Sequence, residues 1–86
     1  VMVKPQFEVG REKLGDGGVV RDSALRKNAV MEVADCAYDM GLGCSGVIAS
    51  PLPGPSGNVE YFLWLKRGAS ELVESALDLA IAKGPQ

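Results

Sequence analysis

Two side chains of opposite charge stand at the tips of apolar segments in this 86-residue sequence. Lys4 ends the short apolar run VMV, and Glu60 lies near the start of the run NVEYFLWL. Removing one partner from a buried ion pair costs about 3–5 kcal/mol, so a carboxylate beside a core is expected to need a cation. Two interpretations follow: Lys4 and Glu60 form a plain ion pair, or Lys4 is a lysine placed for proton transfer and held by Glu60.

The segments around these charges predict three strands and two helices. The expected strands cover residues 1–4, 44–49 and 59–66, and the helices are expected to begin at Asp22 or Ser23 and at Ser70. Glycines at 41 or 43 and the run Lys83, Gly84, Pro85 should end them. Apolar residues recur at helical spacing in both helices: Leu25, Ala29, Val33, Cys36, Ala37 and Met40 in the first, and Leu72, Val73, Ala76, Leu77, Ala80 and Ile81 in the second.

The connections between these elements predict how the strands are ordered. A strand, a helix and a second strand form a unit whose two strands run in the same direction. Only nine residues link the second strand to the third, too few for a crossover, so the third should run antiparallel. Because residues 59–66 are apolar on both faces, this strand is expected to be central, with Phe62 and Trp64 in the core between two helix layers. The fold class is then α/β, a three-stranded mixed sheet with two helices.

This topology brings the two charged residues together. The first strand ends at the edge of the sheet where the third strand begins, so Lys4 and Glu60 should lie side by side. Open α/β sheets bind ligands at such an edge. The residues alone do not separate the ion pair from the proton-transfer site, and both interpretations stay open.

Two irregular segments flank the expected site. Residues 8–21 hold four glycines and predict a long loop, whose Arg11, Lys13 and Arg21 could each meet one RNA phosphate. Residues 50–58, SPLPGPSGN, predict a rigid turn rather than a proline-rich ligand, and Ser56 and Asn58 within it could touch substrate.

Composition excludes several functional classes. The net charge of −2 argues against a generally basic nucleic-acid binder, so RNA contacts would be local. No apolar run approaches a membrane span, and the start VMVKPQF lacks signal-peptide features, which favours a cytoplasmic protein. The sequence has no histidine, and Cys36 and Cys44 fit no zinc or redox spacing, so we expect two reduced, partly buried cysteines. The opening on an uncapped strand suggests a fragment of a longer protein.

Three segments carry a family resemblance. VKPQFEVG (3–10), GGVVRD (17–22) and SPLPGPSGNVEYFLWL (50–65) closely resemble the C-terminal half of the TlyA family, named for hemolysins and regarded as ribosomal RNA methyltransferases with an FtsJ-like catalytic domain. The resemblance implies that residues 1–86 are the C-terminal half of an S-adenosylmethionine-dependent, Rossmann-like domain. Its three strands would be the last three of a seven-stranded sheet with a reversed strand between its neighbours.

The resemblance also implies roles for the charged pair. FtsJ-like enzymes methylate a ribose 2′-hydroxyl with a Lys-Asp-Lys-Glu tetrad, and two of its members match Lys4, as general base or proton acceptor, and Glu60, as its orienting partner. The first Lys, the Asp, the glycine-rich cofactor loop and an S4-like RNA-binding domain would lie upstream. The full-length protein would then use S-adenosylmethionine on ribosomal RNA, whereas this fragment should bind no cofactor and be inactive.

Two other functional classes stay open: a noncatalytic interaction module and a membrane-active hemolysin. The acidic outer face of the last helix argues against the hemolysin, because membrane-surface helices favour Lys and Arg. With upstream strands absent, the edge of the first strand would be exposed, which predicts a homodimer or an exchanged-segment assembly.

Overall fold

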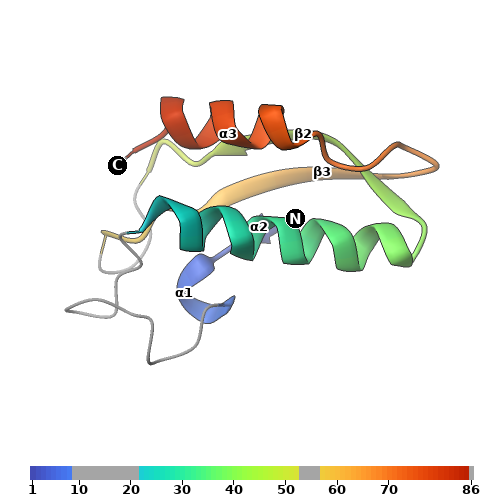
Figure 1. The fold of residues 1–86 in the computed structure, drawn as a ribbon, viewed down its shortest axis with the longest axis horizontal. Coiled ribbons are helices and arrows are strands. Elements are labelled where there is room, and N and C mark those ends of the chain that lie inside the picture. Colours follow the sequence, from blue (N-terminus) through green and yellow to red (C-terminus); the bar gives the residue numbers. More distant parts are fainter. Residues whose placement is uncertain (9–21, 53–56, 86) are drawn as a thin grey trace.

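One three-stranded sheet and two long helices build the chain (Figure 1). The computed structural model describes residues 1–8, 22–52 and 57–85. In chain order the elements are β1 (Met2–Val3), α1 (Pro5–Glu8), α2 (Ser23–Asp39), β2 (Leu42–Ala49), β3 (Tyr61–Arg67) and α3 (Glu74–Lys83). Most of the predicted loop 8–21 and the middle of the predicted turn 50–58 lie outside the described residues.

The strand order confirms that the third strand is central and reversed. The order is β1-β3-β2, and β3 is antiparallel to both neighbours. β1 is registered through Met2 opposite Phe62 and Val3 opposite Tyr61. β2 pairs along its whole length, from Leu42 opposite Arg67 to Ala49 opposite Tyr61, with an irregularity between Cys44 and Gly46. β1 and β2 run in the same direction as expected, but they do not pair with each other, so both described pairings are antiparallel.

Helix α2 begins and ends where the sequence predicts. Asp22 is its N-cap, and its Oδ1 accepts a hydrogen bond of 2.8 Å from the backbone N–H of Ala24. This bond satisfies one of the backbone donors that a helix leaves free at its start. At the other end, Gly41 has a φ of 90°, a conformation that glycine adopts at no steric cost. The predicted start at Asp22 and the predicted end near Gly41 are therefore both explained by local backbone chemistry.

Both long helices pack on the same face of the sheet. In Figure 1, α2 and α3 run in opposite directions, and Lys27 of α2 bonds to Glu74 and Asp78 of α3. One buried cluster unites the helices with that face: Val3, Val30, Ala34, Cys44, Val59, Tyr61, Leu63, Leu72, Leu77 and Ile81. Burial of this apolar surface is the main stabilising contribution to the fold.

The single helical layer corrects the expectation for Phe62 and Trp64. Side chains alternate across a strand, so the residues next to buried Tyr61 and Leu63 point to the other face. Trp64 is 52% exposed and Phe62 is half-buried, and neither belongs to the core. Among the described residues both long helices pack on one face of the sheet, so the prediction of two helix layers was wrong for this part of the chain. An apolar strand face indicates that something covers it but does not identify the element that does.

Three smaller expectations also needed correction. Cys36 of α2 and Met40, the C-cap of that helix, are exposed. Cys44 is buried as expected, and both cysteines are free. Helix α3 begins at Glu74 after Val73, not at Ser70. Ser70 instead uses its backbone carbonyl to accept a 2.9 Å hydrogen bond from the N–H of Cys44.

The segment before α3 passes directly over Gly43. A Cβ atom placed on Gly43 would lie 1.9 Å from the carbonyl oxygen of Ala69 and 2.5 Å from that of Ser70. Such a separation is impossible for real atoms, so glycine is needed here for close approach of the two backbones. This contact, with the bond from Cys44 to Ser70, anchors the start of β2 to the segment that leads into α3.

Candidate functional site

Lys4 and Glu60 meet at the end of β1, as the topology predicts. The Nζ atom of Lys4 lies 3.7 Å from Oε2 of Glu60. The pairing of Val3 with Tyr61 explains this contact. Because β1 and β3 are antiparallel, Lys4, which follows Val3, lies opposite Glu60, which precedes Tyr61. The Lys4 side chain is 40% exposed and that of Glu60 only 9%. The amine can therefore be reached from solvent, while the carboxylate is held behind it.

The backbone of Glu60 is also fixed from the β2 side. Its carbonyl accepts a 2.7 Å hydrogen bond from the N–H of Ser50, just after β2 ends. Ser50 in turn makes local hydrogen bonds with Leu52 through its hydroxyl, which stabilise the start of the turn. Oε2 of Glu60 has no hydrogen-bond partner among the described residues. The carboxylate is thus free to orient an amine.

A short helix that the sequence did not predict follows Lys4. Pro5 opens α1 and is fully buried. Proline favours the first position of a helix, because its fixed φ suits helix geometry and its missing N–H would have no partner there. Both amide atoms of Gln6 are buried without a hydrogen-bond partner in the described part of the chain. Pro5 was the available signal for α1, whereas nothing in the sequence marks Gln6 as buried.

A second polar pair lies beneath the site, on the side of the helices. Arg26 of α2 is 3% exposed and Tyr61 of β3 is 0% exposed. Burial raises the pKa of Tyr61, and the nearby Arg26 guanidinium partly opposes that rise. One guanidinium nitrogen of Arg26 donates a 3.3 Å hydrogen bond to the carbonyl of Pro85. Sequence reasoning missed Arg26, because arginine is rarely buried without a paired acid.

The predicted RNA contacts stay predictions. Arg11, Lys13, Arg21 and Ser56 lie outside the described residues. Asn58 is described and is 3% exposed. Within the described ranges, no group of three or more His, Cys, Asp or Glu side chains could hold a metal ion.

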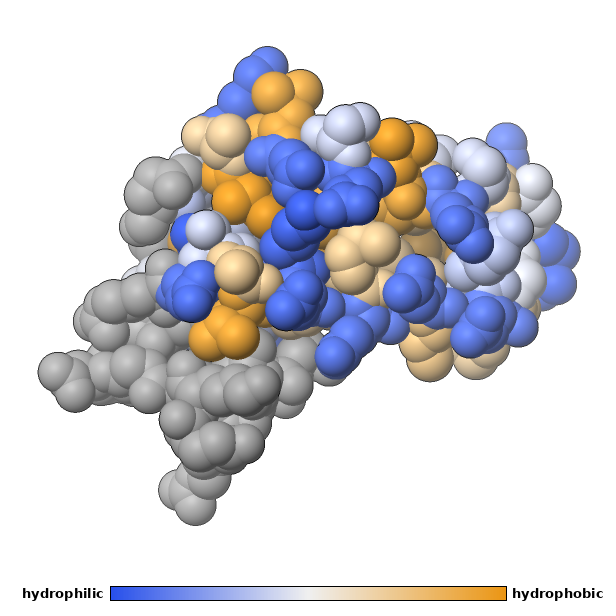
Figure 2. Space-filling model, viewed as in Figure 1, coloured by the Kyte–Doolittle hydropathy of each residue, from blue (hydrophilic) through white to orange (hydrophobic). Residues whose placement is uncertain are grey.

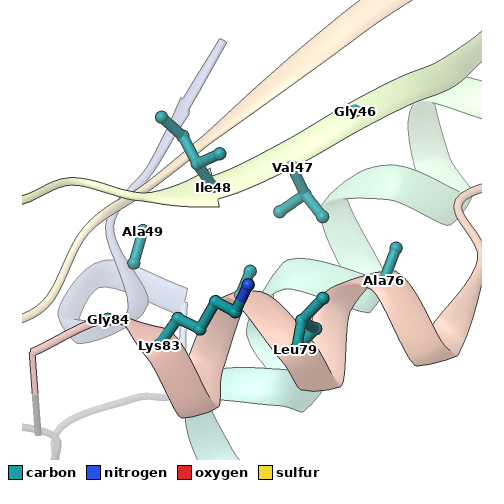
Figure 3. Close-up of a pocket in the computed structure, with 9 residues that line it drawn as sticks. Gly46, Val47, Ile48, Ala49, Ala76, Leu79, Lys83 and Gly84 are labelled. Carbon is teal, nitrogen blue, oxygen red and sulfur yellow. The ribbon is translucent and has the colours of Figure 1, made fainter.

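The apolar grooves lie apart from the charged pair. One groove of about 430 Å³ runs between β2 and α3, with Val47 and Leu79 on its two sides and the amine of Lys83 beside it (Figure 3). Another, of about 620 Å³, is lined by Val1, by residues of α2 such as Val33 and Cys36, and by Met40 just after the helix. Neither groove includes Lys4 or Glu60. The charged pair is a surface site at the end of the sheet, not the floor of either groove.

The described residues on the side that α2 presents form no broad apolar region. Figure 2 shows hydrophilic residues over much of this face, with smaller apolar patches between them. No helix in the described part of the chain is long and apolar enough to cross a bilayer.

The described fold agrees with the family comparison. The FtsJ-like methyltransferase family matches residues 1–67, which include β1, β2, β3, Lys4 and Glu60. The chain therefore belongs to the FtsJ-like methyltransferase family.

The relatives within this family are more specific. The chain is 52% identical over 89 residues to the 16S/23S rRNA (cytidine-2′-O)-methyltransferase TlyA of Mycobacterium tuberculosis, a match that covers 98% of this chain and 33% of that protein. It is 36% identical over 64 residues to Hemolysin A of Brachyspira hyodysenteriae, covering 70% of this chain and 25% of the relative. The match thus spans about a third of the length of the first relative and a quarter of the length of the second.

A solved structure supports the same fold. The Streptococcus thermophilus protein named "Putative hemolysin" superposes with a TM-score of 0.84 at 34% identity. The match covers 95% of this chain and 30% of that one.

Proposed function

We propose that this chain is the C-terminal part of a catalytic domain that transfers a methyl group from S-adenosylmethionine to a ribose 2′-hydroxyl of ribosomal RNA. The observation that carries the proposal is the contact of 3.7 Å between Lys4 and Glu60 at the end of the sheet. The family match and the 52% identity to a 2′-O-methyltransferase support the same reaction.

The geometry suits a proton-transfer role for Lys4. A ribose hydroxyl is a weak nucleophile, and its oxygen attacks more readily as its proton leaves. The exposed Lys4 amine would accept that proton once it has given up its own, and the buried Glu60 carboxylate would hold the amine in one orientation. Neither group needs a metal ion for this role.

The apolar groove between β2 and α3 does not fit the cofactor. S-adenosylmethionine carries a ribose and charged groups, which require convergent polar partners. The groove between β2 and α3 is lined by glycine and apolar side chains except for Lys83 (Figure 3). We therefore expect the upstream two thirds of the full-length protein to bind the cofactor, and this chain alone to be inactive. Calorimetric titration of the chain with S-adenosylmethionine should show no micromolar binding, and micromolar binding would refute this expectation.

Substitution in the full-length protein tests the catalytic roles. Lys4→Met should lower kcat for methylation of ribosomal RNA by about 10²–10⁴-fold, the usual contribution of a general base. Glu60→Gln should reduce it less, because the amine remains. Lys83→Ala changes an exposed lysine away from the pair and serves as the control. Activity of Lys4→Met equal to that of the control would refute the proposal.

A relative named Hemolysin A is the reason to test a second function, a membrane-active role. Release of dye from liposomes by the full-length protein would favour a membrane-active role, and its absence alongside methylation of RNA would favour the enzyme.

The outer edge of β1 supports association of the isolated chain. β1 lies at the end of the strand order, and Val1 and Met2 are 63% and 42% exposed. Exposed strand edges pair readily with other chains. Light scattering should detect a dimer, and a monomer at all concentrations would contradict this part of the proposal.

A further inference from the structure

The position of Lys4 relative to Glu60 depends on very little sheet. β1 has two residues, and Val3 opposite Tyr61 is the last registered pair before the charged residues. α1 starts immediately after Lys4, at Pro5. Any shift of the pair Val3 and Tyr61 would therefore be passed directly to the distance between Lys4 and Glu60.

Tyr61 is packed on the opposite face of β3 from Glu60. It is among the largest fully buried side chains described, and it shares the core with Val3, which is 2% exposed. Its hydroxyl has no hydrogen bond of good geometry in the described part of the chain, although the Arg26 guanidinium lies near enough to influence it. The interior thus places a phenol and a cation directly behind the charged pair.

The burial of Arg26 lowers the stability of the fold unless other contacts compensate for it. It is 3% exposed, its Nε has no hydrogen-bond partner, and no carboxylate lies within 4 Å of its guanidinium among the described residues. A buried charge without an acid lowers stability unless polar contacts compensate. Its one described side-chain hydrogen bond, to the carbonyl of Pro85, attaches the segment after α3 to the first turn of α2.

These contacts join three parts of the chain at one end of the sheet. Arg26 belongs to the start of α2, Tyr61 to the start of β3, and Pro85 to the C-terminal segment, and Figure 1 shows these regions on the same side of the molecule. We propose that Arg26 and Tyr61 are positioning residues that hold β1 and β3 in the register that sets the distance between Lys4 and Glu60. The inference rests on the proposed function, because that distance matters only if the pair acts on substrate.

Kinetics of the full-length protein test this inference. Arg26→Met removes the guanidinium, and Tyr61→Phe removes the hydroxyl that interacts with it electrostatically. Each variant breaks this contact between α2 and β3 and should lower kcat for RNA methylation by about tenfold, because small displacements of reacting groups have large effects. KM for RNA should stay unchanged, because neither residue touches substrate. Arg26→Lys, which keeps the charge and a donor, should recover most of the lost kcat. Lys27→Met is the matched control: Lys27 is the next residue on α2 and bonds to α3 instead, so its loss should affect stability and not kcat.

The outcomes separate positioning from a merely structural role. Unchanged kcat in Tyr61→Phe and Arg26→Met, or a decrease no greater than that of Lys27→Met, would overturn the inference. If Arg26→Met does not fold, Tyr61→Phe and Arg26→Lys decide the result by the same criteria. If the unsubstituted protein methylates no RNA, the proposed function fails, and crystal structures then decide the inference alone. A longer separation of Lys4 Nζ and Glu60 Oε2 in Tyr61→Phe would support it, and an unchanged separation would overturn it.

Discussion

Glu60 is much more deeply buried than Lys4, its partner: the side chains are 9% and 40% exposed. The loss of either partner should therefore have unequal effects on stability. Lys4→Met leaves a buried carboxylate without a cation and should lower the free energy of unfolding by about 1–2 kcal/mol, less than for a fully buried pair because Lys4 is solvated. Glu60→Gln leaves only a solvated amine and should cost about 0.5 kcal/mol. Urea unfolding of both variants measures the difference, and an equal or larger cost for Glu60→Gln would contradict it.

Gly43 gives a prediction about backbone packing. Gly43→Ala should destabilise the chain by more than about 2 kcal/mol, because overpacking against main-chain atoms cannot be relieved by a rotamer change. Gly46→Ala, also in β2, is the matched control, since its Cβ would lie 3.5 Å from the Trp64 ring in ordinary contact. Thermal unfolding compares the two variants. Equal melting temperatures would show that the segment Ala69–Ser70 is not held against β2 as described.

Lys27 gives a prediction about alkaline stability. Its hydrogen bonds of 2.6 Å to Glu74 and 2.9 Å to Asp78 raise the pKa of Lys27 above its ordinary value of 10.5. A raised pKa means that the folded state binds the proton more tightly, so the stabilisation is complete below pH 10.5 and is lost as pH rises through the folded-state pKa. The difference in unfolding free energy between the unsubstituted chain and Lys27→Met should be constant up to about pH 10 and should decrease as the pH rises through the folded-state pKa, which lies above 10.5.

Denaturant unfolding across this pH range checks the prediction for Lys27. Tyr61, whose pKa burial also raises, is present in both proteins and cancels in the difference. A difference that persists unchanged to the highest pH would mean that the charge of Lys27 does not link α2 to α3.

The site could be predicted because it depends on connectivity. A nine-residue link between the second and third strands fixes the direction of β3, and the apolar run from Tyr61 to Leu65 makes it central. Those two facts are enough to place Glu60 beside Lys4, and the register of β1 and β3 confirms the placement. The N-cap at Asp22 could also be predicted, because its hydrogen bond to the N–H of Ala24 joins residues only two positions apart.

The errors concern packing between distant segments. Trp64 and Phe62 are predicted to be core residues, but the two long helices of the described residues, α2 and α3, pack on the other face of the sheet. Ser70 has the side chain of an N-cap but is held at the edge of β2 by its backbone, so α3 starts later. Arg26 was missed because its burial depends on Tyr61 and Pro85, which are far from it in sequence.

The face of the sheet opposite α2 and α3 carries a fluorescent residue that can report on its surroundings. Trp64 is the only tryptophan in the sequence, and it stands half in water beside Gly46 of β2. Its fluorescence should be that of a solvated indole in the isolated chain. Any segment or molecule that covers this face would shift the emission to shorter wavelength, so association can be followed without a label.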